Sequence, residues 1–238
     1  MNAAMYKALS GAIVQTRRLE IVTQDLANTN TAGYKGERLI FREVLEAPVK
    51  PDERIGGQVA VIEQHTDFSN GSFRYTGNPL DLALVGDGFF AVQTPRGVRY
   101  TRQGTFNLSA QNTLVMPSGE PLLGEGGPIR VEGSKVDVTA DGMVLVDGEE
   151  VDRLKIVRPQ DARRLVREGS TFFRIAEEEM EAVKDPHVEQ GSLEEANVNP
   201  IESMVALIDI SRQFEAYERA MRTIDSATEK AVNEAGKL

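Results

Sequence analysis

The chain has 238 residues, 40% of them hydrophobic and 27% charged, and its formal net charge is -10. This length is enough for one large domain, or one medium domain with extensions. The acidic balance argues against nucleic acid as a partner, because phosphate binding requires clustered Lys and Arg. The chain contains no cysteine, which excludes disulfides, thiolate chemistry and Cys-ligated zinc.

The sequence predicts no membrane-spanning segment. It has no uncharged apolar stretch that approaches 18 residues, the length needed to cross a bilayer as a helix. We also expect no cleaved secretory signal, because Lys7, Arg17 and Arg18 interrupt the first apolar stretch and no basic region precedes it.

Residues 1–28 are predicted to form a helix. Apolar or small side chains recur three and four residues apart, and no proline interrupts the run. The heptad line is only weakly apolar, because two of its members are threonines. It consists of Met5, Leu9, Ala12, Thr16, Leu19, Thr23 and Leu26.

A longer helix is predicted from Pro200 to about Glu234. Asn199 is a favourable N-cap, and Pro200 lies at the first helical position, where its missing N–H costs nothing. At ~1.5 Å per residue this helix would be roughly 50 Å long, too long to lie across one small domain. Its apolar line, with spacings of three and four, includes Leu207, Ile210, Phe214, Tyr217, Met221 and Ile224.

The middle of the chain is predicted to be an antiparallel β-domain. Turn signals such as Asp141-Gly142 and Asp147-Gly148 separate short runs rich in Val, Ile, Phe, Thr and Tyr. The predicted fold is therefore mainly β, with terminal α-helices that form a coiled-coil-like pair. We divide the chain into an N-terminal helical assembly segment (1–35), a β-rich domain (36–198) and a C-terminal helical assembly segment (199–238).

The terminal helices are expected to bury each other only in part. A two-stranded coil that projects from a domain leaves one flank exposed, and isolated helices with softened seams are marginal in water. The alternative is that each helix packs on the β-domain. We favour other copies of the same chain as the cover, because each apolar line spans several heptads.

The N-terminal motif resembles the signature of bacterial flagellar axial proteins, the rod, hook and hook-associated subunits. In that family a helix ends in an Ala-Asn-x-x-Thr-x-Gly-Tyr/Phe-Lys run. The matching positions here are Ala27, Asn28, Thr31, Gly33, Tyr34 and Lys35. Asn and Thr side chains satisfy backbone groups at a helix end, Gly33 lets the chain reverse, and Tyr34 anchors the reversal.

Two further motifs are similar to the same family and follow in the right order. The stretches "LALVGDGFFAV" and "YTRQGTFNL" match motifs of rod and hook proteins. The C-terminal signature begins with Gly191, Leu193, Glu194, Asn197 and Val198, ahead of the long helix. Together the motifs cover nearly the whole chain and favour the proximal-rod FlgF type, with the distal-rod FlgG type as the alternative.

The resemblance implies a structural subunit of the flagellar basal-body rod. The implied partners are other copies of the chain, other rod proteins and the flagellar type III export apparatus. The implied location is the rod where it crosses the periplasm, reached without a cleaved signal peptide. The two terminal helices would build the wall of an inner tube, and the β-domain would pack around it.

Chemical motifs are weak, and we assign no catalytic residue, cofactor or metal. Gly86-Asp87-Gly88 leads into a strand rather than a helix, so we predict a hairpin turn and not a phosphate loop. His65 and His187 are far apart and are expected in exposed loops. Two other functions remain open. Two of the 37 acidic residues could form a carboxylate pair that cleaves glycan. The chain could also be a secreted binding β-module, although this function would not explain the two helices.

Overall fold

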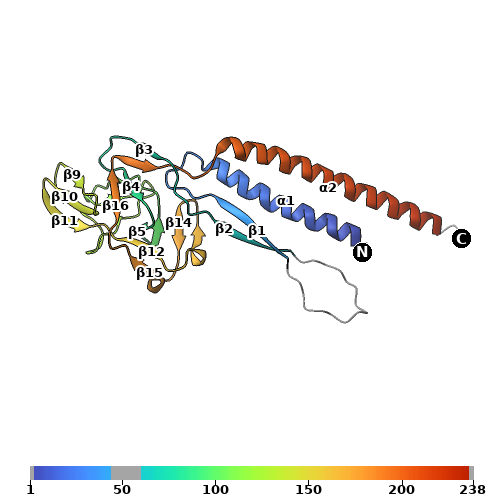
Figure 1. Ribbon diagram of the computed structural model, residues 1–238, viewed down its shortest axis with the longest axis horizontal. Helices are drawn as coiled ribbons and strands as arrows, with labels where there is room; N and C mark the ends of the chain where they lie inside the picture. The colour runs from blue at the N-terminus through green and yellow to red at the C-terminus, as the bar shows by residue number, and fades with distance from the viewer. Residues whose placement is uncertain (1–2, 44–59, 236–238) are drawn as a thin grey trace. The chain divides into compact units, whose positions relative to one another are not determined.

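The computed structural model describes residues 3–43 and 60–235 (Figure 1). Residues 1–2, 44–59 and 236–238 fall within the predicted segments but lie outside the described residues. The chain forms two compact units. We call Met1–Ala27, Glu37–His65 and Asn199–Leu238 the helical unit, and Asn28–Gly36 and Thr66–Val198 the β unit.

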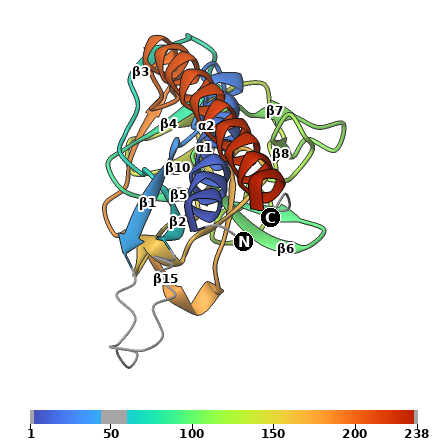
Figure 2. The same cartoon turned by 90° about the vertical axis from the view of Figure 1, so that its right-hand side faces the viewer.

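The helical unit contains the two terminal helices. α1 (Ala3–Ala27) and α2 (Pro200–Ala235) pack side by side and run in opposite directions, as Figures 1 and 2 both show. α1 also packs against a two-stranded sheet of β1 (Glu37–Glu43) and β2 (Ala60–Thr66). The predicted start of the long helix is confirmed, since the Asn199 carboxamide oxygen accepts hydrogen bonds from the backbone N–H of Ile201 (3.0 Å) and Glu202 (3.4 Å).

The heptad line predicted for the first helix is wrong. Leu9 and Leu19 are exposed at 46% and 38%, and Thr16 and Thr23 are also exposed. Ala12 of the line is buried, but Gln15 and Ile21, which lie outside the line, are buried as well. α1 contacts both α2 and β1, so it is covered on more than one side, and a two-helix seam does not describe its buried face.

The β unit is built from short antiparallel strands. Its largest sheet has the order β13 (Val166–Glu168), β14 (Phe172–Arg174), β6 (Gly97–Thr101), β5 (Phe89–Thr94), β12 (Ile156–Pro159), β15 (Met180–Ala182). A three-stranded sheet has the order β11 (Glu149–Arg153), β10 (Met143–Val146), β9 (Val136–Val138).

Three pairs and two single-turn helices complete the unit. The pairs are β16 (His187–Gln190) with β4 (Leu82–Val85), β17 (Ser192–Glu194) with β3 (Phe73–Tyr75), and β7 (Asn107–Leu108) with β8 (Leu114–Val115). The 3-10 turns are η1 (Ala162–Arg164) and η2 (Glu177–Glu179). The predicted fold class, mainly antiparallel β with terminal helices that pack together, is confirmed.

Strand β5 separates two hydrophobic cores. Successive residues of a strand point to opposite faces of the sheet, and here the neighbours Phe89 and Phe90 are both buried. Phe90 packs edge-to-face on Phe106 with ring centroids 5.5 Å apart. Phe89 instead packs on Phe68 and Phe173, both at 5.7 Å. The central strand is thus held on both faces.

Local turn signals predicted some connections and not others. Asp141-Gly142 joins β9 to β10 and Asp147-Gly148 joins β10 to β11, both as hairpins. Gly86-Asp87-Gly88 is a turn but not a hairpin, because β4 pairs with β16 whereas β5 pairs with β6 and β12. The predicted loop position of the histidines is also wrong, because His65 lies in β2 and His187 in β16. His187 is exposed as predicted, whereas His65 is half-buried.

Ile210→Ala is expected to destabilise the helical unit far more than Ile208→Ala. Ile210 is only 1% exposed, so the truncation should cost about 2–5 kcal/mol, the range for large-to-small changes in a core. Ile208 is 55% exposed, and its truncation should stay within about 0.5 kcal/mol. Urea unfolding followed by helical circular dichroism measures both, and equal losses would contradict the assigned faces of α2.

Candidate assembly site

The polar run after α1 folds into successive turns within the β unit. The backbone N–H of Thr31 donates to the carbonyl of Asn28 (3.0 Å), and the Thr31 hydroxyl donates to the Asn28 side-chain oxygen (3.2 Å). The N–H of Tyr34 then donates to the carbonyl of Thr31 (3.2 Å). These bonds satisfy backbone groups immediately past the last helical residue, where a helix has no partners of its own.

Gly33 has two reasons to be glycine. Its φ is +68°, in the left-handed region that L side chains rarely adopt. A Cβ at this position would also overlap the backbone of Arg102 and Gln103. The close approach lets the N–H of Gly33 donate to the backbone carbonyl of Glu194 at 2.7 Å.

Tyr34 anchors the reversal from a fully buried position. Its side chain is 0% exposed, and the guanidinium of Arg167 lies 4.9 Å from the centre of its ring. The same guanidinium lies 5.1 Å from the ring centre of Phe173 and donates a hydrogen bond to the backbone carbonyl of Lys35. Each cation–π contact of this kind is worth about 0.5–2 kcal/mol.

The centre of the site is a buried cluster of three charges. The Lys35 ammonium donates to one carboxylate oxygen of Glu194 at 2.6 Å, and both side chains are only 1% exposed. The Arg102 guanidinium, 3% exposed, lies 3.4 Å from the other carboxylate oxygen. We call Lys35, Arg102 and Glu194 the charge cluster.

Backbone groups complete the charge cluster. Lys35 also donates to the carbonyl of Ser69 (2.7 Å), and Arg102 donates to the carbonyls of Leu84 (3.1 Å) and Gly86. The Glu194 carboxylate accepts a further bond from the N–H of Gly71 (3.0 Å). Within the described part of the chain, Arg102 Nε is buried without a hydrogen-bond partner. The cluster is therefore almost, but not fully, satisfied.

The cluster holds two cations against one anion. Burial lowers the pKa of Lys35 from its ordinary value, and the neighbouring Glu194 carboxylate opposes that change. Burial likewise lowers the pKa of Arg102, opposed by Glu194 and then Asp87. Glu194 is thus the group that keeps two desolvated cations in the interior. Its removal would leave both cations without the carboxylate that they contact directly.

Asn197 and Leu193 hold the C-terminal strand of the site in place. The Asn197 side-chain oxygen accepts from the N–H of Gly36 (2.7 Å), and its amide donates to the carbonyls of Asp67 (2.8 Å) and Ser69 (3.0 Å). Leu193 is buried in β17 and pairs with β3. One amide side chain therefore ties together three segments that are distant in the sequence.

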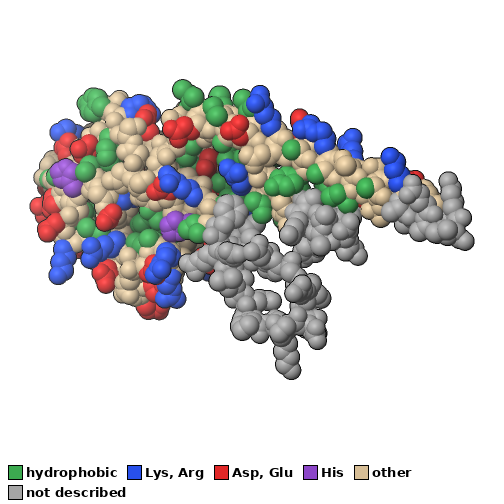
Figure 3. Space-filling view, turned by 45° about the vertical axis from the view of Figure 1, so that its right-hand side comes forward, with side chains coloured by type: hydrophobic (Ala, Val, Ile, Leu, Met, Phe, Trp, Pro, Cys, Tyr) green, Lys and Arg blue, Asp and Glu red, His purple; other side chains and the backbone are tan. Residues whose placement is uncertain are grey.

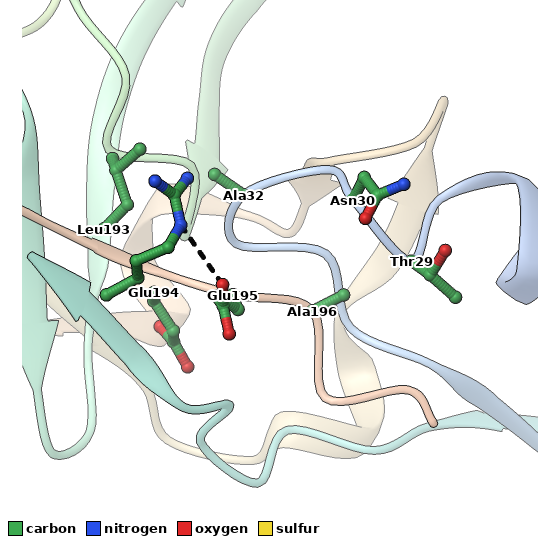
Figure 4. Close-up of a pocket in the computed structure, with 8 residues that line it drawn as sticks. Thr29, Asn30, Ala32, Leu193, Glu194, Glu195 and Ala196 are labelled. Atoms are coloured by element: carbon green, nitrogen blue, oxygen red, sulfur yellow. Dashed lines mark hydrogen bonds and ion pairs between the residues drawn. The ribbon is translucent and has the colours of Figure 1, made fainter. Parts of the chain in front are cut away.

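A surface pocket of about 280 Å³ lies in the β unit, between residues 29–32, which follow α1, and residues 193–196, which precede α2. Figure 4 shows Thr29, Asn30 and Ala32 from the N-terminal run near Glu195 and Ala196 from the C-terminal one. The pocket also includes Arg74, whose guanidinium donates to the Glu195 carboxylate at 3.1 Å. Glu195 of this exposed ion pair directly follows Glu194 of the buried one.

The predicted apolar line of α2 varies in exposure along its length. Ile210 is buried, and Phe214 is 37% exposed. At Gly11 of α1 a Cβ would lie only 2.5 Å from the ring of Tyr217, so the missing side chain makes room for that ring. The half-buried members are Leu207, Tyr217, Met221 and Ile224.

Sequence reasoning missed a second apolar face of α2 and missed the charge cluster. Four exposed residues, which we call the outer stripe, lie on the first turns of α2: Ile201, Met204, Val205 and Ile208. The cluster residues were all present in the recognised motifs, Lys35 in the first, Arg102 in the second and Glu194 in the third. A charged residue in each motif was the available signal.

Comparison with known proteins places the chain in a family. Residues 83–165 match the family described as "Flagellar hook protein FlgE/F/G D1 domain", and residues 189–234 match "Flagellar basal body rod FlgEFG protein C-terminal". The flagellar basal-body rod protein FlgF of Caulobacter vibrioides is 33% identical over 244 residues, covering 100% of both chains. The chain belongs to the flagellar basal-body rod proteins of the FlgF type.

Other relatives agree with this assignment. FlgF of Salmonella typhimurium is 34% identical over 94% of this chain and 95% of its own. The basal-body rod protein FlgG of Bacillus subtilis is 26% identical over 98% and 99%. A protein of this family is a structural subunit of the flagellar basal-body rod, and its location is the basal body.

The described residues also bear on metal binding and on membrane insertion. No group of three or more His, Cys, Asp or Glu side chains suited to a metal ion occurs among them. None of their helices combines the length and the apolar character needed to cross a bilayer.

Glu194→Gln is expected to destabilise the β unit by about 3–5 kcal/mol, the range for removing one partner of a buried ion pair. Glu195→Gln is the matched control, since the Arg74–Glu195 pair is exposed and surface pairs contribute only about 0–1 kcal/mol. Denaturant unfolding of the full chain gives both free energies. A loss at Glu194 no larger than at Glu195 would show that the cluster does not hold the fold.

Gly33→Ala is expected to cost clearly more than Gly169→Ala. The two glycines have similar φ, +68° and +75°, so the conformational cost of about 1–2 kcal/mol is shared. Only Gly33 faces backbone atoms, whereas nothing lies within 4 Å of a Cβ at Gly169. The overlap should add about 1–3 kcal/mol, as in an overpacked core. Indistinguishable unfolding midpoints for the two variants would contradict the close approach to Arg102.

Proposed function

We propose that this rod subunit works by self-assembly, as part of the proximal segment of a hollow drive shaft. The two terminal helices form the wall of an inner tube together with the helices of neighbouring chains, and the β-rich region stiffens it from outside. The single observation that supports this most strongly is the similarity to FlgF proteins over the whole chain, at 33% identity in the Caulobacter vibrioides relative.

The charge cluster suits a subunit that transmits torque. The segment that follows α1 and the segment that precedes α2 are bonded to each other inside the β unit, through Gly33 with Glu194 and Gly36 with Asn197. Within these segments, residues 31–36 and 193–198 are buried or half-buried. The segments by which both helices connect to the β unit are therefore held within that unit by hydrogen bonds and buried charges.

The apolar residues of the helices are proposed to supply the assembly free energy. The predicted candidates are Leu207, Ile210, Phe214, Tyr217, Met221 and Ile224 of α2, but Ile210 is only 1% exposed in the single chain and stabilises the helical unit instead. The other five keep exposed surface that a neighbouring chain can cover. Each fully buried side chain of this type contributes about 1.5–3 kcal/mol. Within this proposal, 1–35 and 199–238 act as assembly segments, and 36–198 is the outer domain, anchored to them through Asn28, Thr31, Gly33, Tyr34, Leu193 and Asn197.

Membership of the rod family also leads us to propose its route and neighbours. We expect export through the flagellar type III apparatus without a cleaved signal peptide, followed by assembly with other axial proteins where the rod crosses the periplasm. The absence of cysteine suits such a route, because no disulfide has to form after export. We propose no enzymatic activity and no cofactor.

The direct test replaces the chromosomal gene with an epitope-tagged copy and isolates basal bodies. The tagged chain is expected in the rod, next to the base and not at its distal end. Phe214→Asp should prevent incorporation while leaving the near-ultraviolet circular dichroism of the β unit unchanged. Normal incorporation of that variant would refute the role of Phe214.

Glycan cleavage is the competing function, and a separate assay decides it. Purified protein is incubated with peptidoglycan, with lysozyme as the positive control. No soluble fragments are expected. Fragments released by the full chain, and not by an unfolded sample, would replace the structural role with a lytic one.

A further inference from the structure

The outer stripe is an apolar surface that the helical pair leaves uncovered. Ile201, Met204, Val205 and Ile208 are exposed at 71%, 53%, 55% and 55%. Their spacing of i, i+3, i+4 and i+7 places them on one face of α2 over two turns. Figure 3 shows hydrophobic side chains reaching the surface along the helices. Contiguous exposed patches of this kind mark interaction sites.

A second uncovered patch lies on α1, far from the outer stripe. Leu9 and Ile13 are exposed at 46% and 58% and are one turn apart, and we call them the α1 patch. Gly11, between them, lies against Tyr217 of α2. Val205 is 12 residues before Tyr217, which is about 18 Å along the helix axis. The two patches thus lie at different levels of the helical pair.

The two patches have opposite charge around them. Residues 200–212 contain two acids, Glu202 and Asp209, and one base, Arg212, so their net charge is negative. Residues 3–20 contain three bases, Lys7, Arg17 and Arg18, and one acid, Glu20, which pairs with Arg17, so their net charge is positive. Opposite charges around two apolar surfaces favour their association and disfavour the pairing of either surface with itself.

We propose that the outer stripe of one copy docks on the α1 patch of the next copy. The inference rests on the proposed self-assembly and names the surfaces that carry it. A contact between two different patches is heterologous, and heterologous contacts that do not close into a ring extend indefinitely. This pairing therefore supplies a repeat along the shaft, and it uses residues other than those between α1 and α2.

Engineered cysteines test the pairing in a chain that has none of its own. Val205→Cys and Ile13→Cys are made in separate copies with different tags and expressed together in place of the wild type. A disulfide forms only when the two Cα atoms come within about 7 Å. Basal bodies from these cells are expected to contain at least ten times more mixed disulfide dimer than same-tag dimer.

Thr23→Cys replaces Ile13→Cys as the matched control, since it is exposed on the same helix and about 15 Å away. A yield with Ile13→Cys no higher than with Thr23→Cys overturns the proposal, and so does a Val205→Cys dimer with itself as the main product. Purified mixtures of the same variants, oxidised at increasing concentration, must show the same preference even if a variant fails to enter the rod.

The two proposals fail in distinguishable ways. Cysteine variants that enter the basal body without forming the mixed disulfide refute this pairing and leave the proposed function intact. A wild-type tagged chain that is missing from basal bodies refutes the proposed function itself.

Discussion

The carboxylate of Glu194 is the constraint on which the β unit depends. It is the anion that the buried cations Lys35 and Arg102 share, and these three residues come from the N-terminal, central and C-terminal parts of the chain. Uncompensated buried charge is among the most destabilising features a fold can contain. The β unit is consequently complete only when the segment after α1 and the segment before α2 are both in place within it.

The neighbouring structure serves the same closure. Gly33 brings its own backbone against that of Arg102, and the ring of Tyr34 packs on the guanidinium of Arg167. The Asn197 side chain bonds its own segment to the segments of Gly36 and Asp67. The helical unit follows a different logic. There, the apolar faces exceed what two helices and a small sheet cover, as the outer stripe shows. Buried charges and hydrogen bonds hold the charge cluster of the β unit together, whereas the first turns of α2 keep a contiguous apolar stripe exposed. That division of labour suits a subunit of a shaft.

Local signals in the sequence predicted local structure. The cap at Asn199, the proline at the first position of α2 and the hairpin at Asp147-Gly148 depend only on adjacent residues, and all three are present. Strand partners depend on distant residues, which is why Gly86-Asp87-Gly88 proved to join two different sheets. Which side chains of α1 are buried could not be predicted from their spacing, because β1 packs on that helix in addition to α2. The charge cluster joins residues 159 positions apart, and no periodicity encodes such a pair.

Hydrogen–deuterium exchange of the full chain tests most directly whether the segment after α1 and the segment before α2 belong to the core of the β unit. The informative amides are those of Gly33, which donates to the Glu194 carbonyl, and Gly36, which donates to the Asn197 side chain. The account predicts that both exchange as slowly as the Ala91 amide in the central strand, which bonds to Lys155. Exchange of both at the rate of an unstructured peptide, with Ala91 still protected, would contradict it.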